Sequence, residues 1–292
     1  MYNETAELRA LWDSGLIIES IINDEDLHRV PTINKPNSRN GWYVAHRKTI
    51  IFGDWQTGLK QTLRRANYQL STSTLALRKE QKVREFNKWK KQNEMALVAK
   101  KIFEDAKFAN ENYFGHKYLI EKGLKFVNTV KVSEGTLMVP LVELKTNELR
   151  SLQLIQLCGS KQFLAGGQVK GLCHPIGQAI KGICVCEGYA TAVSIAENEN
   201  MQLLVLAAMN ANNLKEVAQK ARQCFPRHKI IVAADDDYKT FQKTGINPGM
   251  EHALKAAESV AGEVWSPPFD EEQKIAGLTD WNDYYNIARR RA

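Results

Sequence analysis

The sequence predicts an α/β fold in which a small α+β N-terminal domain and a long helix precede a doubly wound parallel sheet. Three observations predict this order. Short β-rich runs broken by Pro, Asn and Gly occupy residues 28–55. A stretch without Gly or Pro follows at residues 59–114. From residue 139 onward, short apolar strands alternate with helical stretches.

Residues 5–22 carry apolar side chains at helical spacing, which predicts a helix over this range. The β-rich runs that follow predict a small antiparallel sheet. Four aromatic residues are crowded into fourteen positions of this sheet. We interpret them as its core, with a base-stacking platform as the alternative: Trp42, Tyr43, Phe52 and Trp55.

Residues 75–109 are rich in helix formers and follow Ser and Thr residues that are good N-cap candidates. They predict one long helix of roughly 50 Å, at about 1.5 Å per residue. Between Arg78 and Lys107 it carries ten basic and five acidic side chains. Two interpretations stay open. The helix is either a solvated connector or a nucleic-acid contact made by Arg84, Lys88, Lys91 and Trp89.

The second half of the chain alternates strands and helices, which implies a parallel, doubly wound sheet. The predicted strands are residues 183–186, 203–206, 230–234 and 263–265. The predicted helices between them are residues 191–197, 214–223 and 250–260.

The net charge of +7 and the pI of about 9.0 suit a polyanionic partner without proving one. Most of the excess lies early, because residues 1–112 hold 19 basic and 14 acidic side chains against 21 and 19 in residues 113–292. The sequence lacks the long apolar run of a membrane span, and its first residues lack the features of a signal peptide. We therefore predict a cytoplasmic protein with no membrane contact.

The five cysteines are irregularly spaced and include no CxxC pair, which argues against a disulfide framework. Cys184 and Cys186 alternate with Ile183 and Val185 in an apolar run that is typical of a buried strand. We predict a structural role for them and no structural zinc, since a zinc site needs more suitably placed ligands.

Acidic residues follow two of the predicted strands. Glu187 follows one directly, and Asp235, Asp236 and Asp237 follow another. Ligands of open α/β sheets bind outside the carboxyl ends of the strands, so carboxylates there are placed for chemistry. Because side chains alternate along a strand, we expect Asp235 and Asp237 to point to one side and Asp236 to point away.

Glu187, Asp235 and Asp237 together form a hard, oxygen-rich ligand set that suits Mg²⁺ or Mn²⁺. Such ions can activate a 3′-hydroxyl, stabilise charge on an α-phosphate and hold a pyrophosphate leaving group. The alternative is that the three aspartates form a solvated loop or cap the next helix.

At these residues the sequence resembles the Toprim superfamily, which is shared by bacterial-type primases, topoisomerases, OLD-family nucleases and recombination-mediator proteins. The matching elements are residues 185–192 (VCEGYATA), residues 233–237 (AADDD) and the Asn-Pro-Gly at 247–249. The resemblance implies acid/base chemistry for Glu187 and divalent-metal binding by Asp235 and Asp237.

The resemblance extends to plasmid and phage primases of the P4-type-like group. It covers residues 136–171 and 278–284, Tyr118-Leu119 with Lys122-Gly123 upstream of these, and residues 23–58 near the amino terminus. It implies a small N-terminal domain at 1–70 that is a candidate for template binding and a basic helical connector at 71–112. A primase-core subdomain at 113–180 and a Toprim catalytic domain at 181–292 follow.

Two departures from those primases affect the expected partners. Many carry a cysteine-rich zinc module at the amino terminus, whereas this chain has no cysteine before Cys158. A P-loop motif of a fused helicase is also absent. We therefore expect unwinding to come from a separate helicase.

Further polar residues are candidates for the site. Lys161 and Lys170 lie in a Gly-rich segment, which we interpret as a mobile loop that contacts the triphosphate or the template backbone. A solvated hairpin is the alternative. Arg150, on the preceding strand, is another candidate. Asp280 and Asp283 either form an outer part of the acidic site or cap the last helix.

The function that these features imply is that of a DNA primase. It would synthesise short RNA primers on single-stranded DNA from ribonucleoside triphosphates, with Mg²⁺ or Mn²⁺, for replication of a mobile element. Two alternatives stay open. One is a Toprim nuclease that uses the same carboxylates, and the other is a non-catalytic DNA-binding accessory protein.

Overall fold

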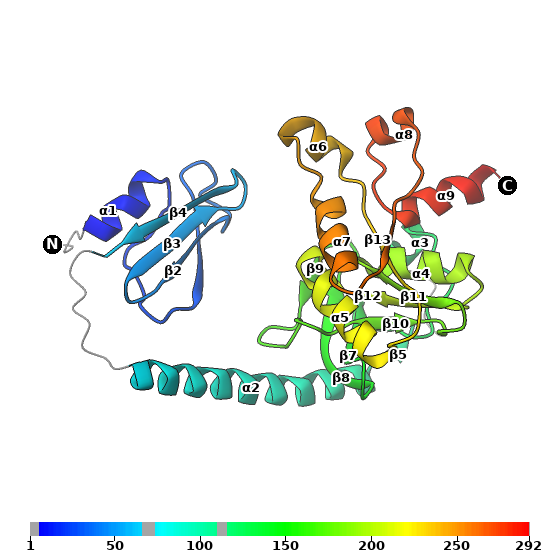
Figure 1. Cartoon of the computed structure of the whole chain (residues 1–292), viewed down its shortest axis with the longest axis horizontal. Helices are drawn as coiled ribbons and strands as arrows, with labels where there is room; N and C mark the ends of the chain where they lie inside the picture. The colour runs from blue at the N-terminus through cyan, green and yellow to red at the C-terminus, as the bar shows by residue number, and fades with distance from the viewer. Residues whose placement is uncertain (1–5, 66–73, 110–115, 292) are drawn as a thin grey trace. The chain divides into compact units, whose positions relative to one another are not determined.

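The computed structural model describes residues 6–65, 74–109 and 116–291, except for the side chains of residues 74–82, 290 and 291. The chain divides into two compact units, residues 1–80 and residues 81–292 (Figure 1). None of the helices in the described ranges combines the length and the apolarity that crossing a membrane requires.

The first unit is a four-stranded antiparallel sheet with one helix packed against it. The strands follow one another in the order β1-β2-β3-β4, and the elements are α1 (Ala6–Asp13), β1 (Leu27–Val30), β2 (Gly41–Ala45), β3 (Thr49–Asp54) and β4 (Leu59–Arg64). The predicted antiparallel sheet is confirmed. Apolar residues of α1 and its following loop pack on one face of the sheet, against Tyr43, Ile50 and Phe52.

The helix predicted over residues 5–22 is wrong beyond Asp13. Gly15 adopts a positive φ of 85°, which ends the helix. The backbone of Leu16 then bridges to Thr32. The apolar spacing of this segment therefore reflects burial beneath the sheet rather than continued helix, since Leu16 and Ile18 lie in the same core as α1.

The long helix α2 spans Thr74–Asp105 and ends four residues before the predicted position. It ends there because β5 (Lys107–Phe108) pairs with β6 (Lys131–Ser133). Ala99, Ile102 and Phe103 attach the helix to the sheet that follows, where they pack against Met138 and Leu152.

A five-stranded antiparallel sheet follows α2 in the second unit. Its order is β5-β6-β7-β8-β9, with β7 at Thr136–Glu143, β8 at Glu148–Ile155 and β9 at Lys161–Phe163. The short helix α3 (Lys117–Glu121) lies between β5 and β6 in sequence. Lys161 therefore belongs to a strand, which corrects the prediction that it lies in a mobile loop.

The last sheet has the order β10-β12-β11-β13-β14. Its strands are β10 (His174–Ile176), β11 (Gly182–Cys186), β12 (Leu203–Ala207), β13 (Ile230–Ala233) and β14 (Glu263–Trp265). β11 to β14 are parallel, as predicted. β10, which the sequence did not predict, pairs antiparallel with β12.

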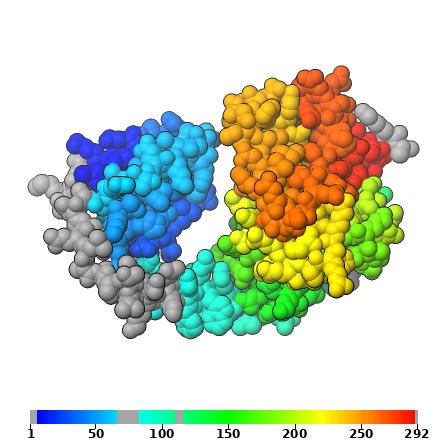
Figure 2. Space-filling model, in the orientation of Figure 1, coloured from blue at the N-terminus to red at the C-terminus, as the bar shows by residue number. Residues whose placement is uncertain are grey.

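Helices cover both faces of this parallel sheet, so the predicted doubly wound α/β architecture is confirmed. α4 (Tyr189–Asn198) packs on one face, with the buried Cys184 and Cys186. On the other face, α5 (Leu214–Cys224) and α7 (Pro248–Glu258) pack with Ile183 and Val185. Figure 2 shows α5 in yellow and α7 in orange on the visible surface. The remaining helices are α6 (Tyr238–Thr244), α8 (Glu271–Ala276) and α9 (Trp281–Arg291), with the 3₁₀ turn η1 at Ala211–Asn213.

Candidate active site

The acidic residues lie at the carboxyl edge of the parallel sheet. β11 and β13 are hydrogen-bonded neighbours, with Cys186 paired to Ala233. Glu187 directly follows β11, and Asp235 lies two residues beyond the end of β13. The sheet thus brings together two carboxylates that are 48 positions apart in the sequence.

Asp235 is the most perturbed acid of the cluster. Its Oδ1 atom is buried and accepts no hydrogen bond from the part of the chain that the structure describes. Burial first, and then the negative charges of Glu187, Asp280, Asp237 and Asp283, raise the pKa of Asp235 to about 8. A carboxylate whose negative charge is so poorly compensated is stabilised by a cation. A bound divalent ion attracts all of the acids and so offsets the repulsion among them.

Glu187 shares the same environment. Burial and the charge of Asp237 raise the pKa of Glu187, while Lys161 and the backbone of Ala211 lower it. A carboxyl group with a raised pKa can hold and release a proton nearer neutral pH, as acid/base chemistry requires.

The Asn-Pro-Gly segment holds the aspartate loop in place. The Asn247 side chain caps α7, and its Oδ1 also accepts the Asp237 backbone N–H at 3.1 Å. The Gly249 N–H donates to Asp237 Oδ2 at 2.8 Å. A Cβ at Gly249 would lie 2.4 Å from the Asp235 carbonyl oxygen, so only glycine allows this approach. Asp237 also benefits from the positive end of the α7 dipole.

Asp236 points away from the cluster, as predicted. It is buried, and its carboxylate accepts from Asn247 Nδ2 at 2.8 Å and pairs with Lys274 Nζ at 3.0 Å. Its backbone N–H donates to the Thr279 carbonyl at 2.7 Å. The Asp236 backbone thereby joins the aspartate loop to the segment that precedes α9.

Asp280 and Asp283 bring a second pair of acids to the site. The Asp283 N–H donates to Asp280 Oδ1 at 2.8 Å, and the Thr279 N–H donates to Asp283 Oδ2 at 3.1 Å. The two aspartates therefore cap the start of α9. They also face the cluster, because both raise the pKa of Asp235. The capping role is therefore confirmed, and the role of both residues in the acidic site stays a prediction.

Lys122 is a basic residue of this site that was not among the site residues predicted from the sequence. Its Nζ lies 3.6 Å from Asp283 Oδ1 and 4.0 Å from Asp280 Oδ2. The sequence signal for it was only the Lys-Gly pair after α3. Gly123 has a positive φ of 62°, which turns the chain there.

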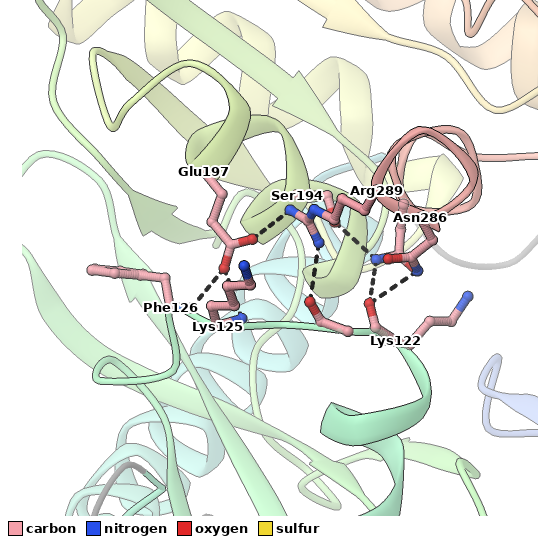
Figure 3. A network of polar contacts seen from close by, with 9 residues as sticks. Lys122, Lys125, Phe126, Ser194, Glu197, Asn286 and Arg289 are labelled. Carbon is pink, nitrogen blue, oxygen red and sulfur yellow. Dashed lines mark hydrogen bonds and ion pairs between the residues drawn. The ribbon is translucent and has the colours of Figure 1, made fainter. Parts of the chain in front are cut away.

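α9 holds the backbone at Lys122 and Gly123 in a buried polar network (Figure 3). Asn282 and Asn286 each donate to the Lys122 carbonyl, at 2.8 and 3.1 Å. Arg289 donates to the Gly123 carbonyl at 3.0 Å and to Glu197 at 2.6 Å. The network therefore fixes the position from which the Lys122 side chain reaches the acids.

Lys161 completes the basic side of the site. Its Nζ lies 5.3 Å from the centre of the Tyr118 ring. Burial and the charge of Lys122 lower its pKa, while Asp280, Glu187 and Asp235 raise it. Lys161 and Lys122 line a cavity of about 410 Å³, together with Tyr118 and Asp283.

The other predicted basic residues have their contacts elsewhere. Lys170 pairs with Glu216 at 2.9 Å, in a loop that Asn213 clamps through hydrogen bonds with the backbones on either side of it. Arg150 bonds Asn93 of α2 and lies 3.5 Å from Glu148. Arg84, Lys88 and Lys91 are exposed along α2.

The donor set fits Mg²⁺ or Mn²⁺ in the manner typical of phosphate-handling sites. Within the described ranges, no three His, Cys, Asp or Glu side chains form a group that could hold a metal ion by themselves. Mg²⁺ commonly binds through one or two carboxylates and takes its other ligands from water and substrate phosphates. The bare Asp235 Oδ1 and the mutual repulsion of the acids suit such an ion.

Comparison with protein families identifies the region that carries these acids. Residues 182–288 match the model of the Toprim domain. The resemblance inferred from the sequence motifs is therefore confirmed for residues 182–288.

Two curated relatives are both DNA primase TraC of Escherichia coli. One is 27% identical over 287 residues, which cover 89% of this chain and 26% of the relative. The other is 36% identical over 124 residues, which cover 41% of this chain and 8% of the relative. The chain thus spans about a quarter or less of the length of these relatives.

Matches among solved structures include the primase fragment of the bacteriophage T7 primase-helicase protein. It is 16% identical, with a TM-score of 0.40, over 60% of this chain and 66% of that chain. A chain in the structure of the bacteriophage T7 lagging-strand DNA polymerase interacting with primase domains is 15% identical, with a TM-score of 0.36, over 58% of this chain and 83% of that chain.

Proposed function

We propose that this protein is a DNA primase that synthesises short RNA primers on single-stranded DNA, for replication of a plasmid, phage or related mobile element. The observation that carries the proposal is the half-buried acidic cluster around Asp235 at the edge of the region that matches the Toprim domain. The similarity to a plasmid-type DNA primase over 89% of the chain supports it.

In this proposal, Glu187, Asp235 and Asp237 hold Mg²⁺ or Mn²⁺. The bound ion would neutralise charge on the reacting phosphates and favour ionisation of the 3′-hydroxyl. Glu187 takes the proton as the 3′-oxygen bonds to the α-phosphorus and the bond to pyrophosphate breaks. The raised pKa of Glu187, caused first by burial, supports this role.

Lys161 and Lys122 bind the triphosphate of the incoming ribonucleotide. Both line the cavity beside the acids, and their ammonium groups offset the charge that the phosphates add. Tyr118 forms a wall of the same cavity, and Lys161 lies over its ring. The proposal thus assigns the phosphates to this cavity and the metal to the acids beside it.

The template runs over the remaining basic candidates. We propose that Arg84, Lys88 and Lys91 on α2, together with Lys170 and Arg150, contact its backbone, and that residues 1–70 help to hold it. In this scheme residues 71–112 connect that domain to a primase core at 113–180 and to the catalytic domain at 181–292. The protein would act in the cytoplasm, and a separate helicase would supply the single strand.

Primer synthesis on a single-stranded DNA template tests the proposal. With labelled ribonucleotides and Mg²⁺ or Mn²⁺, the wild type should yield short labelled oligonucleotides. Asp235→Asn should lower the yield by at least about 100-fold, as loss of a metal ligand does. Glu251→Gln is the matched control, because Glu251 is an exposed α7 carboxylate that pairs with Lys255 in the next turn.

Three other outcomes would overturn the assignment. Full primer synthesis by a folded Asp235→Asn would remove the acidic cluster from the mechanism. Metal-dependent degradation of the template would show a Toprim nuclease that uses the same carboxylates. Template binding with neither reaction would show a non-catalytic accessory protein.

A further inference from the structure

The antiparallel sheet of the first unit has one covered and one uncovered face within the unit. Residues paired across the strands point to the same side, because side chains alternate along each strand. Tyr43, Phe52 and Ile50 point toward α1 and form the core. The opposite face carries the side chains that alternate with these core residues along each strand. It packs against no described helix of this unit.

The register of the sheet defines this open face. One row across the four strands is Arg29, Trp42, Gly53 and Lys60. The next row is Leu27, Val44, Ile51 and Thr62, and Arg64 follows beside Thr49. The open face therefore combines an aromatic residue, a short apolar row and three exposed cations.

Two stacked indoles form the centre of the open face. The Trp42 and Trp55 rings lie 5.9 Å apart at an interplanar angle of 23°. Trp55 is 50% exposed, although an indole gains free energy when it is buried. The Arg29 guanidinium lies over the Trp55 ring, 5.0 Å from its centre. An exposed aromatic flanked by a cation is the arrangement that stacks unpaired bases.

The local structure supports this pair of rings. Gly53 lies opposite Trp42 in the register. A Cβ there would lie 2.0 Å from the Leu59 carbonyl oxygen and 3.1 Å from Trp42 Cζ2, so the close approach of β3 to β4 beside the indole requires glycine. The buried Asp54 accepts the Gln56 N–H at 2.8 Å, which fixes the turn that carries Trp55. The exposed indole is therefore held in place and is not a loose loop residue.

Charged side chains are also distributed unevenly between the two sides of this unit. Residues 27–65 contain eight Lys and Arg but only one acid, the buried Asp54. Residues 6–26, which form α1 and its following loop, contain six acids and one Arg. The strands and their turns are thus basic, while the helix side is acidic, so a polyanion is attracted to the sheet.

We propose that this open face binds single-stranded DNA. Bases stack on Trp55 and on the exposed edge of Trp42, and backbone phosphates pair with Arg29, Lys60 and Arg64. Duplex DNA fits poorly, because its bases already stack on one another inside the helix. The proposal names the face by which the first unit binds a single strand. Only the identification of that strand as the template rests on the proposed function.

Fluorescence anisotropy of a labelled 20-nucleotide single strand, with the full chain, measures the binding. Trp55→Ala should weaken it roughly 5- to 100-fold, the range expected for the loss of one stacked base. Trp55→Phe keeps a ring and should restore most of the affinity. Lys60→Ala should lower the slope of log K against log salt by about 0.7, the value of one phosphate contact on a single strand.

Arg9→Ala is the control for charge, because Arg9 is exposed on α1 over the opposite face. It should change neither affinity nor slope. Ultraviolet crosslinking of a bromodeoxyuridine strand should attach to the peptides that contain Trp42 or Trp55. This readout is independent of any affinity that the second unit contributes.

Unchanged binding by a folded Trp55→Ala, with no crosslink to either tryptophan, would overturn the proposal. So would tighter binding of a duplex or of RNA of the same length. Asp235→Asn separates this site from the proposed reaction, since it should bind the strand normally while synthesising no primer. A wild type that makes no primer but shows the Trp55 effect would refute the primase and leave the binding face intact.

Discussion

The parallel sheet and the N-terminal sheet expose their candidate sites in different ways. α4 packs on one face of the parallel sheet and α5 and α7 on the other, so its acids can meet a ligand only at the carboxyl edge. The N-terminal sheet has α1 on one face, so its candidate site is the other face. An edge site depends on where strands end, whereas a face site depends on which alternate residues remain uncovered.

The largest expected effects separate turnover from strand binding. Glu187→Gln should lower the rate of primer synthesis by about 100- to 10,000-fold, because the variant loses the proton acceptor. Its affinity for single-stranded DNA should not change. Trp55→Ala should do the reverse, raising the KM for template while kcat stays near that of the wild type. Steady-state kinetics with varied template would measure both.

Substitutions on the two faces of the N-terminal sheet should differ strongly in how much unfolding free energy they cost. Phe52→Ala empties a position in the core beneath α1 and should cost about 3–5 kcal/mol of unfolding free energy. Trp55→Ala removes a half-exposed ring and should cost under about 1 kcal/mol. Urea unfolding followed by circular dichroism compares them. Equal losses would show that Trp55 belongs to the core, which would remove the proposed binding face.

Substitution of two neighbouring aspartates at the sheet edge, Asp235 and Asp236, should change the stability of the metal-free protein in opposite directions. Asp236→Asn weakens buried bonds to Asn247 and Lys274 and should cost about 2–3 kcal/mol. Asp235→Asn removes a charge whose folded-state pKa is raised by burial and by nearby acids, so it should raise the melting temperature. A lowered melting temperature for Asp235→Asn would contradict the repulsion among the acids.

The smallest expected effect is a loss of folding stability at acid pH. It depends on His174, which lies between the two sheets of the second unit. His174 is buried, with Nδ1 bonded to the Pro140 carbonyl and Nε2 to the Thr129 hydroxyl, and burial lowers its pKa to about 4. The unfolded state gains this proton near pH 6.5, so stability falls as the pH drops from 6.5 towards 4. At pH 5 the loss should be roughly 2 kcal/mol. His174→Gln should flatten this part of the stability profile, and an unchanged slope would assign it to other groups.

Patterns within single strands were sufficient to predict much of the parallel sheet. Alternating apolar runs predicted all four parallel strands to within a residue or two. The acids after two of these runs identified the cluster, and the alternation of side chains separated Asp236 from its neighbours. Apolar spacing failed at residues 14–22, where burial against the sheet has the same pattern as a helix face.

The sequence by itself therefore determined the parallel strands and the acids at their ends. These features depend on local periodicity and on strand ends, which neighbouring residues specify. Only the tertiary structure brought Lys122, Lys161 and Asp280 to the same site, because they come from a turn after α3, from β9 and from the start of α9. It also decided that Tyr43 is buried while Trp55 stays exposed, since that depends on which face of the sheet α1 covers.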